Sequence, residues 1–158
     1  MDARDAVREG GLVILMRHGD YSVTADGRKG LNAAGIAAAE RSARFVRDEL
    51  GITDVAALFS SDAERACETA EIMGRHVKYE ERIQDAALRP GGSGIAELVF
   101  RDYCRKRVII VTHIPVIETQ YASFLGRNAF FEFRPASLTV LKYIPGKLCY
   151  EQIASFPV

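Results

Sequence analysis

Four side chains of the sequence have the chemistry to bind and transfer a phosphoryl group. Each follows a short apolar segment directly or after a few residues, and the four are Arg17, His18, Arg65 and His113. A neutral imidazole can attack phosphorus and carry the group as a covalent intermediate. Guanidinium groups bind two oxygens at once and stabilise the charge of a phosphoryl group in transfer. These residue types therefore predict a pocket for a dianion with a nucleophile at its base.

Three short apolar segments would bring these side chains together if they form strands of one parallel sheet. The segments are residues 12–16, Val55–Phe59 and Val108–Val111. Unbroken apolar runs of this length suit strands that are buried on both faces. Ligands of open parallel sheets bind just beyond the carboxyl ends of the strands, which meet at one edge. The sequence therefore predicts a single site at that edge.

Helical patterns alternate with these strands. The predicted helices are residues 32–50, 61–74, 93–103 and about 115–125. Asn32 can cap the first helix, and Ser61 with Glu64 forms a capping box that would begin the second. This alternation predicts an α/β fold, with a three-layer arrangement and a mostly parallel central sheet that has helices on both faces.

The remaining segments are expected to be loops and edge strands of the same single domain, residues 1–158. Loops are predicted over Tyr21–Gly30 and Glu80–Gly94, short strands over His76–Tyr79 and Phe130–Phe133, and longer strands over Leu138–Ile144 and Leu148–Ile153. The Pro-Gly pair between the last two strands is typical of a tight turn. We therefore expect an antiparallel C-terminal edge on the parallel sheet.

Composition argues against several classes of partner and cofactor. The chain has 21 Lys and Arg against 21 Asp and Glu, so no bulk charge draws it to nucleic acid. The basic cluster at residues 101–107 has no aromatic platform and is interpreted as a solvated helix end. Three scattered cysteines, with no HExxH or phosphate-binding P-loop pattern, predict no metal and no cofactor.

The same features bear on location. No apolar stretch approaches the roughly 20 residues that a membrane span needs, and the N-terminus is too charged for a signal peptide. An odd number of cysteines fits a reducing compartment. We expect a cytoplasmic protein with no membrane partner, and the oligomeric state stays open.

The segments around the four side chains resemble the histidine phosphatase superfamily, which includes phosphoglycerate mutases and acid phosphatases. The matching residues are Met16-Arg17-His18-Gly19, then Ser60-Ser61 with Arg65-Ala66 and Glu68-Thr69-Ala70, and then Val111-Thr112-His113. The short chain, Asp20 after the glycine, Leu31-Asn32 with Gly35, and Thr112-His113-Ile114-Pro115 are most similar to SixA-like phosphohistidine phosphatases.

The resemblance implies a role for each of these side chains. His18 would be the nucleophile that becomes phosphohistidine, without a metal. Arg17 and Arg65 would clamp the phosphate, and His113 would hydrogen-bond a phosphate oxygen. Asp20 is a supporting candidate that would help to protonate the leaving group.

The sequence departs from the larger family members at the general acid. Those members place a glutamate before a glycine-containing loop, and Ala87 stands at about that position here. Asp85 is the nearest carboxylate and is the predicted acid, with no acid at all as the alternative. Phosphohistidine needs little acid assistance because its nitrogen leaves readily once protonated. This departure favours phosphohistidine over an alkyl phosphate ester.

These inferences predict a phosphatase that hydrolyses a phosphomonoester or phosphohistidine through a covalent phosphohistidine at His18, and its more specific expected form is a phosphohistidine protein phosphatase. One alternative is a broad small-molecule phosphatase or a mutase, and a mutase ranks low because the chain is short for substrate-covering insertions. An alternative of another class is a non-catalytic module that binds phosphoproteins. The expected partner is accordingly a phosphorylated small molecule or a phosphohistidine protein.

Overall fold

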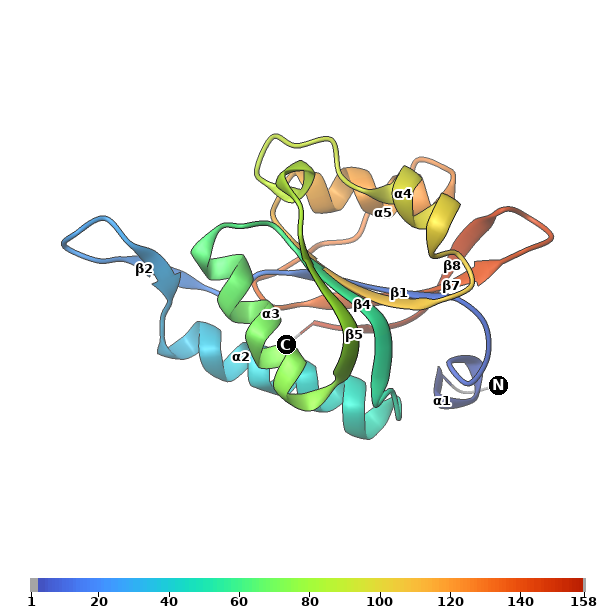
Figure 1. Cartoon of the computed structure of the whole chain (residues 1–158), viewed down its shortest axis with the longest axis horizontal. Helices are drawn as coiled ribbons and strands as arrows, with labels where there is room; N and C mark the ends of the chain where they lie inside the picture. Colours follow the sequence, from blue (N-terminus) through green and yellow to red (C-terminus); the bar gives the residue numbers. More distant parts are fainter. Residues whose placement is uncertain (1–2, 158) are drawn as a thin grey trace.

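A six-stranded mixed sheet forms the centre of the molecule (Figure 1). The computed structural model describes residues 3–157. The strands are β1 (Leu12–Arg17), β2 (Tyr21–Val23), β3 (Lys29–Leu31), β4 (Asp54–Ser60), β5 (Lys78–Gln84), β6 (Arg107–Thr112), β7 (Leu138–Ile144) and β8 (Cys149–Phe156). The helices are α1 (Ala3–Ala6), α2 (Ala33–Arg44), α3 (Glu64–His76), α4 (Ala96–Asp102) and α5 (Val116–Leu125), with a π-helical turn at Phe45–Glu49 and a 3-10 turn at Ala86–Leu88.

The strand order of the large sheet is β5-β4-β6-β1-β7-β8. The first four strands of that order pair in parallel, whereas β7 pairs antiparallel with β1 and β8 pairs antiparallel with β7. Strands β1, β4 and β6 therefore end at the same edge of the sheet. Both the mostly parallel sheet and its antiparallel C-terminal edge are confirmed.

Two apolar cores, one on each face of the sheet, explain the three layers. In β1, Leu12, Ile14 and Met16 pack into the core under α2 and α3, whereas Val13 and Leu15 pack into the core under α4 and α5. All five side chains are fully buried. Burial of each contributes roughly 1.5–3 kcal/mol. The unbroken apolar run is thus explained by a strand covered on both faces (Figure 1).

A close backbone contact fixes α2 against the chain that leaves β1. A Cβ added at Gly35 would lie 2.0 Å from the carbonyl oxygen of Asp20. A Cβ added at Gly19 would lie 2.9 Å from the carbonyl oxygen of Gly35. Neither position can hold a side chain unless the backbone shifts. The two glycines therefore serve close packing beside His18, and Gly19 does not have the positive φ of a strained turn.

The predicted loop at Tyr21–Gly30 was wrong, because this segment forms the β2–β3 hairpin. Its strands pair Tyr21 with Leu31 and Val23 with Lys29. The amide of Thr24 donates to the carbonyl of Arg28 at 2.8 Å, and Gly27 supplies a φ of 85° in the turn. The Gly, Asp, Ser and Thr residues of this segment favour a loop, but only residues 24–28, at the tip of the hairpin, lie outside its two strands. The hairpin projects from the body of the molecule (Figure 1).

The predicted capping box of the second helix was also wrong. Helix α3 begins at Glu64, and its N-cap is Ala63, which makes no side-chain cap. Glu64 instead pairs with Arg28 of the hairpin. The helix also continues past Gly74 to His76. Both residues of the predicted capping box therefore make contacts with distant parts of the chain: Glu64 with Arg28, and Ser61 with His113.

Several other predicted elements differ from the structure, including the predicted helix 93–103, which is α4 at Ala96–Asp102, and the predicted strands His76–Tyr79 and Leu148–Ile153, which are β5 at Lys78–Gln84 and β8 at Cys149–Phe156. Strand β5 runs to Gln84, so the first part of the predicted Glu80–Gly94 loop is a strand. Phe130–Phe133 forms no strand and pairs with no neighbouring strand. The backbone carbonyl of Phe133 instead accepts a hydrogen bond from the side chain of Arg17. The helix that follows Asn32 changes from α to π geometry after Arg44. In residues 3–157, no helix is long and apolar enough to cross a membrane.

Candidate active site

The structure brings the four predicted side chains to one edge of the sheet. Arg17 is the last residue of β1, His18 follows it, and His113 follows β6. Arg65 lies in the first turn of α3, after β4. The imidazole rings of His18 and His113 have centroids 4.8 Å apart. Strand ends that are far apart in sequence thus place these groups together.

Tyr21 lies between Arg65 of α3 and His18, the residue that follows β1. The guanidinium carbon of Arg65 lies 4.7 Å from the centroid of the Tyr21 ring. The same ring meets His18 edge-on, with centroids 5.6 Å apart. No local sequence pattern marks Tyr21, which lies in a segment predicted to be a loop. The residue gives the cation a fixed face beside His18.

A hydrogen bond fixes the tautomer of His18. Its Nδ1 lies 2.7 Å from the carbonyl oxygen of Gly19. A carbonyl oxygen can only accept, so Nδ1 carries the proton and donates. The lone pair of the neutral ring is therefore on Nε2. The amide of Gly19 donates to Oγ1 of Thr69 at 2.9 Å, and that hydroxyl donates to the carbonyl of Arg65 at 2.8 Å, which holds the loop against α3.

Both site histidines are neutral at pH 7. Burial lowers the pKa of His18 to about 4, and the positive charges of Arg65 and Arg17 act in the same direction against the bond to Gly19. Burial and the neighbouring His18, Arg65 and Arg17 lower the pKa of His113 to about 3. Only 5% of His18 and 1% of His113 is exposed. A neutral His18 keeps the lone pair that a nucleophile needs.

We expect the two histidines to stay neutral far into the acid range. In a titration followed by NMR, the His18 ring should show its midpoint below pH 5, because charging it requires burial of a cation beside two arginines. The urea-unfolded chain is the control, and its histidines should titrate near pH 6.5. A midpoint near 6.5 in the folded protein would contradict this account of the site.

Three buried nitrogen atoms of the site have no hydrogen-bond partner among the described residues. They are Nε of Arg17, Nε of Arg65 and Nδ1 of His113. Unpaired buried donors cost free energy, on the order of 1–3 kcal/mol each. A bound phosphoryl group would supply acceptor oxygens for such nitrogens. The arrangement therefore suits a tetrahedral oxyanion.

Nη1 of the Arg17 guanidinium has a partner, in contrast to Nε. Its Nη1 donates to the carbonyl of Phe133 at 2.9 Å, so the segment predicted as a strand serves to hold this guanidinium. Burial lowers the pKa of Arg17, yet an arginine keeps its charge at any physiological pH. The fixed cation beside His18 needs little rearrangement to meet an anion.

The two predicted acidic residues make local contacts. Oδ1 of Asp85 accepts from the amide of Ala87 at 2.9 Å and caps the 3-10 turn. Oδ2 of Asp20 accepts from Nδ2 of Asn32 at 2.9 Å, at the start of α2. Neither contact joins a carboxylate to His18. The general-acid role of Asp85 and the supporting role of Asp20 stay predictions.

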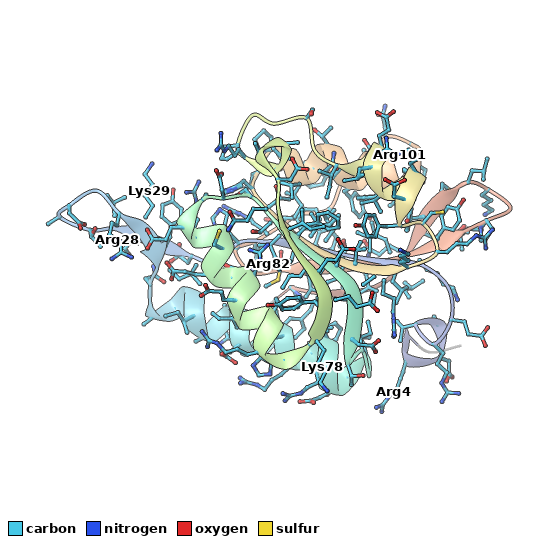
Figure 2. All side chains as sticks on the ribbon, viewed as in Figure 1. Arg4, Arg28, Lys29, Lys78, Arg82 and Arg101 are labelled. Carbon is cyan, nitrogen blue, oxygen red and sulfur yellow. The ribbon has the colours of Figure 1, made fainter. Side chains whose placement is uncertain are left out.

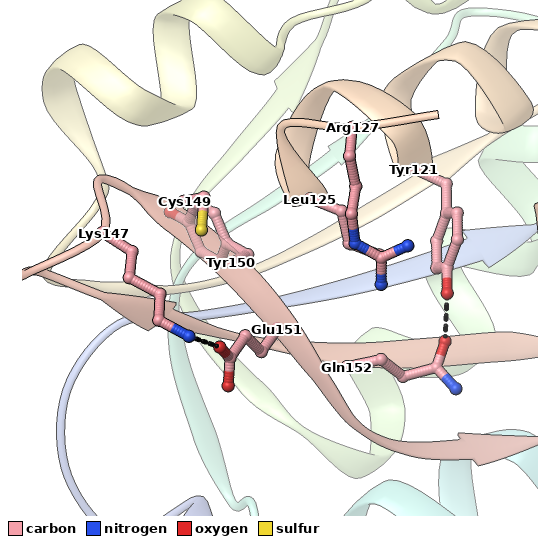
Figure 3. A pocket seen from close by; sticks show the side chains of 8 residues that line it. All are labelled: Tyr121, Leu125, Arg127, Lys147, Cys149, Tyr150, Glu151 and Gln152. Atoms are coloured by element: carbon pink, nitrogen blue, oxygen red, sulfur yellow. Dashed lines mark hydrogen bonds and ion pairs between the residues drawn. The ribbon is translucent and has the colours of Figure 1, made fainter. Parts of the chain in front are cut away.

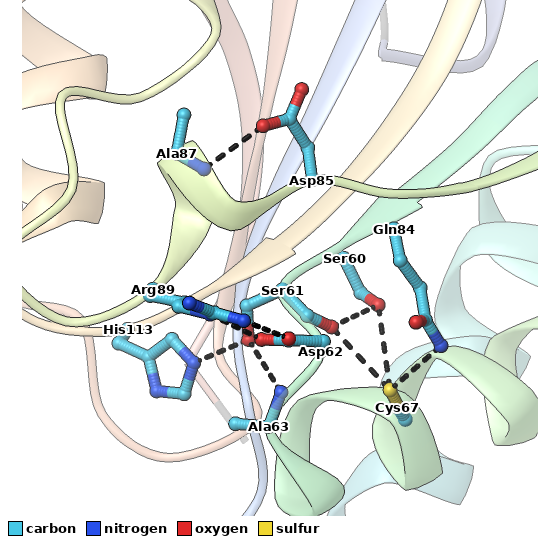
Figure 4. A network of polar contacts seen from close by, with 10 residues as sticks. All are labelled: Ser60, Ser61, Asp62, Ala63, Cys67, Gln84, Asp85, Ala87, Arg89 and His113. Carbon is cyan, nitrogen blue, oxygen red and sulfur yellow. Dashed lines mark hydrogen bonds and ion pairs between the residues drawn. The ribbon is translucent and has the colours of Figure 1, made fainter.

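His113 lies at one end of a polar network beyond the end of β4 (Figure 4). Its Nε2 lies 2.6 Å from Oγ of Ser61. Next to it, Nε of Arg89 donates to Oδ1 of Asp62 at 2.6 Å. The side-chain bond from Arg89 holds the pKa of Asp62 below its usual value. Sequence analysis missed this ion pair, because its partners come from the loops after two different strands.

Charged side chains outside the site form ion pairs with one another. In the basic cluster at residues 101–107, Arg101 pairs with Asp102 and Arg107 pairs with Asp54. Arg101 lies on α4, whereas Arg28 and Lys29 lie on the hairpin at the far side of the molecule (Figure 2). Within residues 3–157, no group of three or more His, Cys, Asp or Glu side chains is placed to hold a metal ion.

A pocket of about 590 Å³ lies away from these groups, between α5 and β8. Tyr121, Arg127 and Lys147 are among the residues that line it (Figure 3). The Tyr121 hydroxyl donates to Gln152 at 2.8 Å, and Lys147 donates to Glu151 at 2.8 Å. None of the predicted site residues lines this pocket.

Known protein structures share this fold. The protein histidine phosphatase SixA complexed with tungstate is 18% identical, over 92% of this chain and 96% of that chain, with a TM-score of 0.77. A SixA protein from Agrobacterium tumefaciens is 23% identical over 92% and 96%, with a TM-score of 0.74. A mutant phosphoserine phosphatase from Entamoeba histolytica in complex with phosphoserine is 15% identical over 92% and 96%, with a TM-score of 0.63.

Sequence comparison gives the family. No curated protein sequence matches this chain. The family model described as histidine phosphatase superfamily (branch 1) matches residues 13–97, which is more than half of the 158 residues. That range contains Arg17, His18 and Arg65, and His113 lies beyond its end. The chain belongs to the histidine phosphatase superfamily, branch 1, and is a phosphatase.

Proposed function

We propose that this phosphatase removes the phosphoryl group from phosphohistidine on a protein, through a covalent phosphohistidine at His18. The observation that carries the proposal is a neutral imidazole, with its lone pair on Nε2, among buried nitrogens of Arg17, Arg65 and His113 that have no partner in residues 3–157. Such a group can accept a phosphoryl group while the surrounding donors bind its oxygens.

In the first step, Nε2 of His18 attacks phosphorus. The new N–P bond forms as the bond from phosphorus to the leaving nitrogen breaks. The leaving imidazole, protonated on its second ring nitrogen, departs as a neutral ring. The positive charge that His18 gains is stabilised by the carbonyl of Gly19, which already accepts from Nδ1 at 2.7 Å.

In the second step, water attacks the phosphorus of the His18 adduct. The N–P bond breaks and its electron pair returns to Nε2, so His18 regains its neutral form with the proton on Nδ1. The phosphate leaves as H₂PO₄⁻, which carries the oxygen and both protons of the water. Arg17 and Arg65 remain charged throughout and stabilise the three equatorial oxygens in both transition states.

The acid side of the site supports a nitrogen leaving group. Ala87 stands at about the position of the glutamate that larger family members carry, and Asp85, the nearest carboxylate, uses Oδ1 to accept from the amide of Ala87. An alkoxide leaving group requires a proton at the moment of cleavage, whereas a protonated phosphoimidazole does not. Likeness of the fold to SixA, named as a protein histidine phosphatase, supports the same substrate class.

A second candidate is a phosphatase for small phosphate esters. The fold is also similar to a phosphoserine phosphatase that was solved with phosphoserine, at a TM-score of 0.63. In this case Asp85 or Asp20 would have to supply the proton for the leaving oxygen. A substrate comparison separates the two candidates directly.

The test is a measurement of phosphate release from two kinds of substrate at equal concentration. One is a phosphorylated histidine-containing phosphotransfer protein, and the other is a panel with phosphoserine, a sugar phosphate and a chromogenic phosphate ester. We expect a higher kcat/KM for the phosphohistidine protein. Asp85→Asn should leave that value nearly unchanged and should lower turnover of the esters.

Two outcomes would oppose the proposal. Faster turnover of the esters than of the phosphohistidine protein would assign the chain to the small-molecule class. Retention of the phosphohistidine protein without phosphate release would indicate a module that only binds phosphoproteins.

A further inference from the structure

We propose that Ser61 is a positioning residue that sets the tautomer of His113, so that His113 offers its single N–H at Nδ1 to the phosphoryl group. The inference deepens the proposed function and rests on it for the identity of the bound group. The tautomer itself can be observed in the protein alone.

The fold places the serine and the histidine side by side. Ser60 is the last residue of β4, and it pairs with Val111 of the parallel strand β6. Ser61 and His113 follow these strand ends at the same edge of the sheet. Oγ of Ser61 lies 2.6 Å from Nε2 of His113, and both residues are buried (Figure 4).

A count of protons decides which atom donates. Oγ of Ser61 has one other described contact, with the amide of Ala63 at 3.3 Å. An amide can only donate, so Oγ accepts there. If Nε2 of His113 also donated to Oγ, the fully buried hydroxyl proton would have no described acceptor. In that case Nδ1 would also be a buried acceptor without a described donor, so two groups would be unsatisfied. When the hydroxyl instead donates to Nε2, only the N–H on Nδ1 lacks a described partner, and this tautomer therefore leaves fewer buried groups unsatisfied.

The consequence lies on the other ring nitrogen. A neutral imidazole has one N–H, and an acceptor role for Nε2 leaves the proton on Nδ1. Nδ1 of His113 is buried and has no partner among residues 3–157. An N–H there can donate to a phosphoryl oxygen, whereas a lone pair would repel it. Ser61 thus decides whether His113 attracts or repels the charge that gathers on the phosphoryl group.

The direct test is 15N NMR of the protein labelled in histidine, which needs only three residues to be assigned, His18, His76 and His113. We expect His113 of the unmodified chain to show a protonated Nδ1 and an unprotonated Nε2 at pH 7. A protonated Nε2 would overturn the inference without any variant.

Ser61→Ala tests the cause of the tautomer. Removal of the hydroxyl should populate the Nε2–H form of His113 and should weaken binding of inorganic phosphate by about 10-fold, the effect of one lost hydrogen bond to a charged group. The matched control is Ser60→Ala. Ser60 is equally buried, and its hydroxyl donates to the carbonyl of Ser61 at 2.7 Å and not to His113.

The outcomes separate this inference from the proposed function. An unchanged His113 tautomer and unchanged phosphate affinity in Ser61→Ala would overturn the role of Ser61. If the tautomer shifts as expected while the chain fails to act on the phosphohistidine protein, the proposed substrate is wrong and the role of Ser61 stands. If Ser61→Ala does not fold, a protonated Nε2 in the spectrum of the unmodified chain still overturns the inference.

Discussion

His18→Ala is expected to lower phosphate release by about 10⁴-fold or more, the scale seen when an enzyme loses its nucleophile. The variant should also fail to form an acid-labile phosphoenzyme, because no other described imidazole nitrogen is placed to replace Nε2. His113 lies beside it, yet its Nε2 is bonded to Ser61 at 2.6 Å, and its Nδ1 carries the proton in the tautomer proposed above, so neither nitrogen has a lone pair free for attack. Rapid-quench labelling with a 32P-phosphorylated substrate measures both effects.

The phosphate pocket should survive this substitution. Arg17 is held by the carbonyl of Phe133 and Arg65 by the ring of Tyr21, and neither contact involves His18. His18→Ala should therefore still bind inorganic phosphate. His76→Ala is the matched control, because His76 bonds to Glu40 and Arg47 on α2 and the π-helical turn. Retention of phosphoenzyme in His18→Ala, or its loss in His76→Ala, would show that another residue is the nucleophile.

The parallel core and the candidate site follow from features that are local in sequence. Every residue from Leu12 to Met16 is apolar because a core covers each face of β1, and such a run therefore indicates a buried strand. Once such runs are parallel strands, their carboxyl ends must meet, and Arg17, His18 and His113 come together by topology alone. The N-terminal turn of α3 then brings Arg65 to the same edge.

The predictions that were wrong, the capping box at Ser61 and the loop at Tyr21–Gly30, failed because contacts between residues far apart in sequence determine those segments. Ser61 and Glu64 have the spacing of a capping box, but Ser61 bonds to His113 and Glu64 pairs with Arg28. No local pattern contains either partner. Tyr21 lies in a hairpin whose strands are largely exposed, so the apolar alternation that would reveal a buried strand is missing. Residues that tune the site were therefore harder to predict than those that form it.

Arg65→Ala is expected to lower kcat/KM by about 10³-fold, near the lower limit for an arginine that stabilises a transferring phosphoryl group. The loss should appear in kcat as well as in KM, because charge on the equatorial oxygens is greatest in the transition state. Arg65→Lys should restore only part of the activity. Lysine keeps the charge but loses the planar fork and the stacking on Tyr21, which lies 4.7 Å from the guanidinium carbon.

Stability distinguishes this effect from simple unfolding. Nε of Arg65 is buried without a partner in residues 3–157, so its removal breaks no described bond of that atom. The substitution also removes the stacking on Tyr21, which opposes the relief of the unpaired Nε. We therefore expect the Tm of Arg65→Ala to change little while activity falls, as for a group retained for its ligand. Arg75→Ala is the control on the same helix. Arg75 is exposed, and its Nη1 lies 3.6 Å from Oε1 of Glu40, outside the site. Activity of Arg65→Ala within about threefold of the unmodified chain would remove this guanidinium from the phosphoryl-transfer step, because one lost charge-assisted bond already costs more.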